Sequence, residues 1–225
     1  MKAFWVLFKK DLALELRRKE SLTLLISLSL LLALTVSLGI NNLFLPMPTV
    51  TKIYIPLLWL ISILCGTLAS SRSYEYEMEN AAYEGVLLTG ISSPAIFLAK
   101  LLSNFLILIC GHFFSAFALA AFLDVDISAA FLAFFVISCA TIFGFTCLAT
   151  LLAAISVNSQ LKGLLLPLLL LPLSLPLFFA GSELSFISIY EGGSLFDSIW
   201  LGLLVGLDLL YLTLGAWLFE HCLKG

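Results

Sequence analysis

One polar stretch, residues 73–93, stands out in an otherwise apolar chain because four glutamates fall within ten positions. In a helix these carboxylates would form a negative face, which anionic lipid headgroups repel and a basic groove of a partner protein attracts. The four glutamates are Glu75, Glu77, Glu79 and Glu84. We therefore predict a docking stretch, and a solvated loop is the alternative for such a charge run.

Two further titratable residues, His112 and Asp208, lie inside apolar runs. A charged carboxylate at the centre of a membrane helix costs about 2.5 to 3.5 kcal/mol, so Asp208 should be paired inside the protein. His112 is expected at a similar depth, and an Asp208–His112 hydrogen bond is one prediction. The alternative is a neutral Asp208 bonded to a Ser or Thr, with His112 as a packing residue.

Catalytic and metal-binding motifs are missing from the sequence. It contains no G-x-x-x-x-G-K-[ST], H-E-x-x-H, G-x-S-x-G or C-x-x-C, so it offers no P-loop for ATP and no signature for covalent haem attachment. We predict no catalytic residue and no metal site in this chain. The five cysteines are expected to be packing residues rather than ligands or disulfides.

The composition indicates a membrane protein. Of the 225 residues, 62% are hydrophobic and 11% charged, and the mean hydropathy of +1.15 is too high for a soluble domain. A bilayer core about 30 Å thick needs roughly 20 apolar residues per helix, and backbone groups in lipid must bond within their own helix. We predict an all-α polytopic protein with a single transmembrane domain, 1–225. The six predicted spans are 21–40, 53–70, 94–123, 127–155, 164–180 and 198–218, with an N-terminal segment 1–20 and a connector 71–93.

Lysine and arginine residues set the predicted orientation. With the N-terminus in the cytosol, Lys52 is the one basic residue of eleven that falls outside, which follows the positive-inside rule. Both termini and the connector 71–93 are then cytoplasmic. Lys100, early in the third span, is expected to reach back to the membrane surface. Membrane lipid and proteins are the expected partners, and nucleic acid is not.

The connector between spans two and three has more than twenty residues, whereas 2 to 8 suffice for most helix connections. We predict a short cytoplasmic helix at about 74–88, which Thr89-Gly90 ends. The residues expected to contact a partner are Tyr76, Glu79, Asn80, Tyr83, Glu84 and Leu87.

Residues 2–18 are predicted to form an amphipathic helix on the membrane surface. Phe4, Trp5, Phe8 and Leu12 lie near one side of this helix, and Glu15 interrupts that side. A cleaved signal peptide is the alternative, but the apolar run is too long for one and no A-x-A site follows. We expect the segment to be retained.

Three prolines, Pro167, Pro172 and Pro176, fall within the fifth span. Each removes a backbone donor and disfavours helical geometry in the preceding residue. We predict a kinked or locally unwound helix, which serves either as a flexible gate or as a bend that packing requires.

Three stretches, taken in order and spacing, resemble the CcmB family, the membrane subunit of the cytochrome c maturation ABC transporter. The first comprises Phe4-Trp5, Phe8-Lys9, Asp11-Leu12 and Arg17; the second runs from Glu84 through Pro94 to Leu98-Ala99-Lys100; the third is Leu171-Pro172-Leu173-Ser174-Leu175-Pro176-Leu177 after Lys162-Gly163. The sequence departs from the family pattern at Cys147, Leu148 and Asp208.

The resemblance implies an ABC-2-like permease in the bacterial inner membrane, which a separate ABC ATPase drives and which itself binds no ATP. The docking stretch would be its coupling helix, and two copies would form a homodimer. Haem-handling membrane subunits and a periplasmic haem chaperone are further implied partners, with haem as the transported or handled ligand. Either haem crosses through this chain, or movement of the coupling helix drives release of the loaded chaperone. An ABC-2 permease for a lipid or drug is the alternative.

Overall fold

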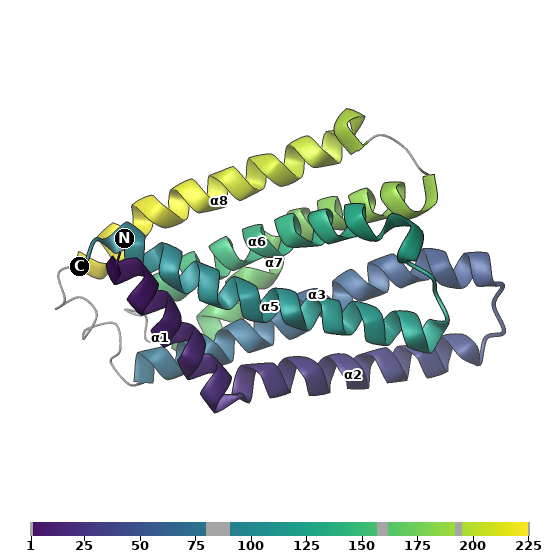
Figure 1. The fold of residues 1–225 in the computed structure, drawn as a ribbon, viewed down its shortest axis with the longest axis horizontal. Coiled ribbons are helices and arrows are strands. Elements are labelled where there is room, and N and C mark those ends of the chain that lie inside the picture. Colours follow the sequence, from purple (N-terminus) through teal and green to yellow (C-terminus); the bar gives the residue numbers. More distant parts are fainter. Residues whose placement is uncertain (1, 80–90, 157–161, 192–194, 225) are drawn as a thin grey trace.

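The computed structural model describes residues 2–79, 91–156, 162–191 and 195–224. Every regular element in these ranges is a helix, and six helices are long and apolar enough to cross a membrane. The predicted all-α polytopic fold is therefore confirmed. The six helices run lengthwise in one bundle, and α1 and the last turns of α8 lie at the same end, which we call the terminal end (Figure 1).

Helix α1 (Lys2–Arg18) is joined to α2 (Glu20–Asn41) by an elbow at Lys19, whose φ of 58° is left-handed. Such a conformation costs a non-glycine residue about 1 to 2 kcal/mol. Backbone bonds support the elbow, because Lys19 N–H donates to the Glu15 carbonyl (3.0 Å) and its own carbonyl accepts from Thr23 N–H (2.7 Å). As a result α1 lies obliquely across the terminal end (Figure 1).

Helix α3 (Met47–Glu79) is longer than the predicted span 53–70 at both ends. It continues to Glu79 without a break, because neither Gly nor Pro occurs between residues 67 and 79. The first residues of the helix predicted at 74–88 therefore belong to α3, and the others lie outside the described residues. Helix α5 (Ser93–Leu123) agrees with the predicted span 94–123, and Pro94 lies in its first turn.

The remaining spans also differ from prediction mainly at their ends. A 3-10 turn, Ser128–Ala130, precedes α6 (Phe131–Ser156), so α6 starts later than expected. Helix α7 (Lys162–Phe186) extends beyond residue 180 and continues as a π-helix, Ile187–Glu191. A 3-10 turn, Leu195–Asp197, precedes α8 (Ile199–Lys224).

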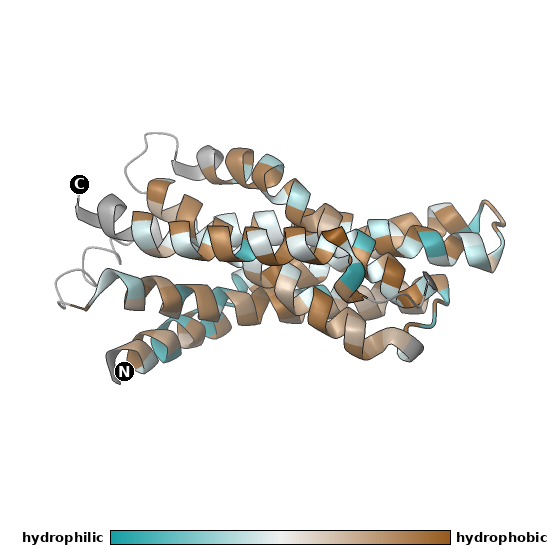
Figure 2. Ribbon diagram, turned by 90° about the horizontal axis from the view of Figure 1, so that it is seen from above, coloured by the Kyte–Doolittle hydropathy of each residue, from teal (hydrophilic) through white to brown (hydrophobic). Residues whose placement is uncertain are grey.

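Helices α5 and α6 form the centre of the bundle. α5 packs against α1, α2, α3, α6 and α8, and α6 packs against α7 and α8 as well. In contrast, only 17% of the membrane-spanning window of α8 is buried. Figure 2 shows hydrophobic residues along the length of the long helices, whereas α1 carries several hydrophilic ones. Most apolar surface of α8 is thus available to lipid or to another subunit.

Candidate functional site

At the terminal end, α3 ends at Glu79 and α5 begins at Ser93, so these two helices flank most of the predicted docking stretch in sequence. Of its six predicted contact residues, Tyr76 and Glu79 lie in the last turn of α3. The other four, Asn80, Tyr83, Glu84 and Leu87, lie outside the described residues. The docking role of all six stays a prediction.

Helix α1 covers this end by packing along α5. Phe8 and Asp11 are buried, whereas Trp5 is 53% exposed. Glu15, which interrupts the apolar side in sequence, accepts a hydrogen bond from the Ser73 hydroxyl of α3. One side of α1 is therefore docked on the protein, and its exposed apolar residues are free to contact lipid.

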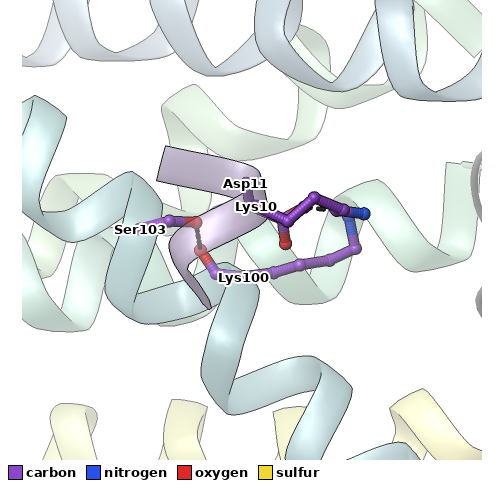
Figure 3. Close-up of polar contacts among 4 residues, drawn as sticks. All are labelled: Lys10, Asp11, Lys100 and Ser103. Carbon is purple, nitrogen blue, oxygen red and sulfur yellow. Dashed lines mark hydrogen bonds and ion pairs between the residues drawn. The ribbon is translucent and has the colours of Figure 1, made fainter. Parts of the chain in front are cut away.

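A charge cluster lies where α1 crosses α5, with Asp11 and Lys100 buried and Lys10 exposed. Lys100 is only 4% exposed, and its side chain runs beneath α1 to end beside Lys10 and Asp11 (Figure 3). Lys10 Nζ lies 3.0 Å from Asp11 Oδ1, and Ser103 Oγ donates to the Lys100 carbonyl (2.9 Å). The expectation that Lys100 reaches the membrane surface is therefore wrong, because α1 lies over it.

Replacing Asp11 by Asn should loosen α1. The change removes the carboxylate beside the exposed ammonium of Lys10 and the buried Lys100, and a lost hydrogen bond to a charged group costs about 1.5 to 3 kcal/mol. We expect trypsin to cut the purified protein within α1 at least roughly tenfold faster, because cleavage requires local unfolding of the helix. Asp126→Asn, an exposed acid at the other end of the bundle, is the control. Equal cleavage rates for both variants would contradict a role of Asp11 in holding α1 on α5.

Behind α1, a buried junction joins α3, α5 and α6. Tyr74 Oη donates to Thr150 Oγ1 (2.8 Å) and accepts from Asn104 Nδ2 (2.6 Å). This junction was not predicted from the sequence because the three residues share no spacing. The one available signal was that polar side chains within spans tend to face the bundle interior.

His112 forms a second junction near the middle of the same three helices. Its Nδ1 lies 2.8 Å from Ser62 Oγ of α3, and its Nε2 lies 3.0 Å from Ser138 Oγ of α6. Trp59 stacks on the imidazole with ring centroids 4.8 Å apart. Both ring nitrogens already have serine partners, so the predicted hydrogen bond between His112 and Asp208 is not formed.

Asp208 instead points from α8 toward α6. A Cβ added to Gly144 would lie 1.9 Å from Asp208 Oδ1, so the absence of a side chain at Gly144 makes room for the carboxyl group. Oδ1 is buried and has no hydrogen-bond partner among the described residues. The alternative prediction of a Ser or Thr partner is therefore not met at this oxygen either.

Helix α7 stays helical through Pro167, Pro172 and Pro176, so the predicted local unwinding is absent at the prolines. Tyr211 Oη of α8 donates to the Leu173 carbonyl, which lies between the last two prolines (2.8 Å). Donors on neighbouring helices satisfy backbone groups near prolines in membrane helices. This bond ties α7 to α8, and the gate role of the prolines stays a proposal.

The described part of the chain contains no group of three or more His, Cys, Asp or Glu placed to hold a metal ion. A cavity of about 10 Å³ beside His112 has room for roughly one water molecule. A broader opening of about 610 Å³ lies at the opposite end, where Phe117 and Phe131 flank Asp124 and Asp126. The interior near His112 is thus closely packed.

A bundle of six helices long and apolar enough to cross a membrane, joined by buried polar bonds, is consistent with a polytopic membrane permease. The model of the CcmB protein family matches residues 2–225, and the chain belongs to this family. The family identifies it as the membrane permease subunit of the haem-export ABC transporter of cytochrome c maturation, a multi-pass inner membrane protein that works with an ABC ATPase. No curated protein matches the chain.

Proposed function

We propose that this permease subunit couples ATP hydrolysis by its ABC ATPase to haem export or to release of the haem-loaded periplasmic chaperone. In this proposal the terminal end faces the cytosol, because ten of the eleven basic residues of the chain then lie inside. The ATPase contacts the stretch that includes Glu79 and Glu84, and it moves α3 and α5 through that stretch. The continuous helix α3, which reaches Glu79, supports this coupling.

Chaperone release is the better supported of the two outcomes. The cavity beside His112 measures about 10 Å³, and a pocket of about 160 Å³ lies between α3 and α7, where Trp59 and Phe178 line it. Both are smaller than typical ligand pockets of about 300 to 1,000 Å³. Haem is then handled by neighbouring membrane subunits, and this chain supplies movement. The exposed face of α8 and the twofold symmetry common in oligomers support a second copy in the complex.

The prolines of α7 are proposed to let that helix bend during the cycle. Pro167, Pro172 and Pro176 each lack the amide proton that would hold the preceding turn, and the bond from Tyr211 to the Leu173 carbonyl carries movement of α7 to α8. This role is separate from the coupling stretch and does not require haem to contact either helix.

Deletion of the gene tests the function directly. We expect haem-stained c-type cytochromes to disappear from the periplasmic side and to return when the wild-type gene is supplied. Haem bound to the periplasmic chaperone, measured in the same cells, separates the two outcomes, because it accumulates if release fails and disappears if export fails. Normal cytochromes in the deletion strain would contradict the proposal and favour an exporter of a lipid or drug.

A further inference from the structure

Helices α3 and α5, which flank residues 80–92, are hydrogen-bonded to each other at three depths in the bundle. Each bond involves a side chain that reaches across from one helix to the other. The bonds are Asn104 Nδ2 to Tyr74 Oη (2.6 Å), Ser62 Oγ to His112 Nδ1 (2.8 Å) and Tyr54 Oη to the Ala116 carbonyl (3.1 Å). We call them the inner, middle and outer rungs.

The three rungs are spread along much of the helix pair, since their residues on α5, from Asn104 to Ala116, cover about 18 Å at 1.5 Å per residue. Tyr54 and Tyr74 are twenty residues apart on α3, which at 1.5 Å per residue is about 30 Å, the thickness of a hydrocarbon core. The partner residues on α5 run in the opposite order, as an antiparallel pair requires. Tyr54, Tyr74 and His112 are at most 3% exposed, so water does not compete for the middle and outer rungs, whereas Asn104 of the inner rung is part-buried.

Two of the rungs continue into α6. Tyr74 donates onward to Thr150 Oγ1 (2.8 Å), and His112 Nε2 meets Ser138 Oγ (3.0 Å). Tyr74 and His112 each hydrogen-bond to side chains of two other helices, so neither can shift toward one partner without breaking its hydrogen bond to the other. The inner and middle rungs therefore hold three helices in one register.

We propose that α3, α5 and α6 move as one rigid lever, with Tyr74, His112 and Tyr54 as positioning residues that keep the three helices in register. A displacement at residues 80–92 then reaches the opposite end of the bundle undiminished. No substrate passes between α3 and α5. The source of the movement is the ATPase coupling proposed above, and the lever rests on that proposal in this respect. The stiffness of the three helices is a property of this chain alone.

Spin-label distances test the stiffness. In a variant without native cysteines, labels at Lys52→Cys and Ala121→Cys report the distance between the outer ends of α3 and α5. In the complete complex this distance should be the same with ATP trapped and with ADP bound. A change in this distance of about 5 Å, one helical turn, would contradict the proposal that α3 and α5 move as one rigid unit.

A second experiment removes the rungs and measures the effect on the same distance. Tyr54→Phe with Tyr74→Phe keeps the ring volume and deletes the hydroxyls, and we expect a broader distance distribution in the chain reconstituted alone. In cells, cytochrome c formed per ATPase complex should fall about threefold for each rung lost, since an interhelical hydrogen bond in a membrane averages about 0.6 kcal/mol. Protein abundance and ATPase binding should stay normal.

Tyr211→Phe is the matched control, because it deletes a hydroxyl that joins α8 to α7 and should leave the α3–α5 distance unchanged. An unaltered distribution in the double variant, or in the further variant His112→Leu, would overturn the proposal. If the wild-type chain holds no ATPase, the coupling function fails instead, and the distribution in the reconstituted chain still decides whether the lever is rigid.

Discussion

The double variant Glu79→Lys, Glu84→Lys loses the ABC ATPase during purification while it still inserts into the membrane. Two reversals place four units of charge change on a stretch that is proposed to dock in a basic groove, and like charges across an interface cost several kcal/mol. We expect the affinity for the ATPase to fall at least roughly 100-fold. Co-purification of the ATPase with a tagged chain, normalised to chain abundance, measures the loss.

A matched reversal at the other end serves as the control for this prediction. Asp124 and Asp126 are exposed acids between α5 and α6, and changing both to Lys alters the net charge of the protein by the same amount. This variant should retain the ATPase. If the Glu79, Glu84 variant also retains it at the wild-type level, the stretch that includes these two glutamates does not bind the ATPase.

Gly144→Ala adds a single carbon atom, yet it is expected to destabilise the bundle strongly. The new Cβ would lie 1.9 Å from Asp208 Oδ1 and 2.9 Å from Leu177 Cδ1, so α6 and α8 must separate or the carboxyl group must move. Overpacking of this kind costs about 1 to 3 kcal/mol, which lowers the melting temperature by about 2 to 12 °C for a chain of this size. Thermal unfolding in detergent, followed by size-exclusion chromatography, measures the shift.

A second substitution distinguishes the clash with Asp208 from a general effect of placing alanine in a membrane helix. Asp208→Ala removes both the clashing oxygen and a buried acceptor without a described partner, so Gly144→Ala with Asp208→Ala should recover most of the lost stability. Gly206→Ala is the control, because nothing lies within 4 Å of its added Cβ. Equal melting temperatures for Gly144→Ala and Gly206→Ala would contradict the close approach of α6 and α8.

Much of the fold could be predicted from the lengths of the apolar runs and from the residues at their ends. Apolar length identified all six spans, because each must satisfy its own backbone hydrogen bonds in lipid. The first and third spans agree with α2 and α5 to within one residue at each end, since Asn42 directly after α2 and Pro94 in the first turn of α5 are local stop and start signals. The N-cap of α5 is Ser92, without a side-chain cap bond, rather than Ser93. The family assignment, made from order and spacing in the sequence, is confirmed over residues 2–225.

Helix ends without such signals were predicted less well. Residues 71–79 are polar, and polarity alone suggested that the span had ended at residue 70. The structure continues α3 to Glu79, because a helix leaving the membrane has no reason to stop where its residues still favour helix. Likewise, the alternation of apolar and charged residues in α1 predicted an amphipathic helix, but it did not show that protein rather than lipid covers Asp11.

The sequence by itself determined the class of protein, the number of spans and the excess of basic residues that sets the proposed orientation. Only the tertiary structure decided which intramembrane polar groups meet. His112 and Asp208 have similar depths in sequence, yet His112 bonds Ser62 and Ser138 while Asp208 faces Gly144. Depth follows from position along a helix, whereas partners follow from how each helix is rotated and shifted against its neighbours, which is a property of the packed bundle.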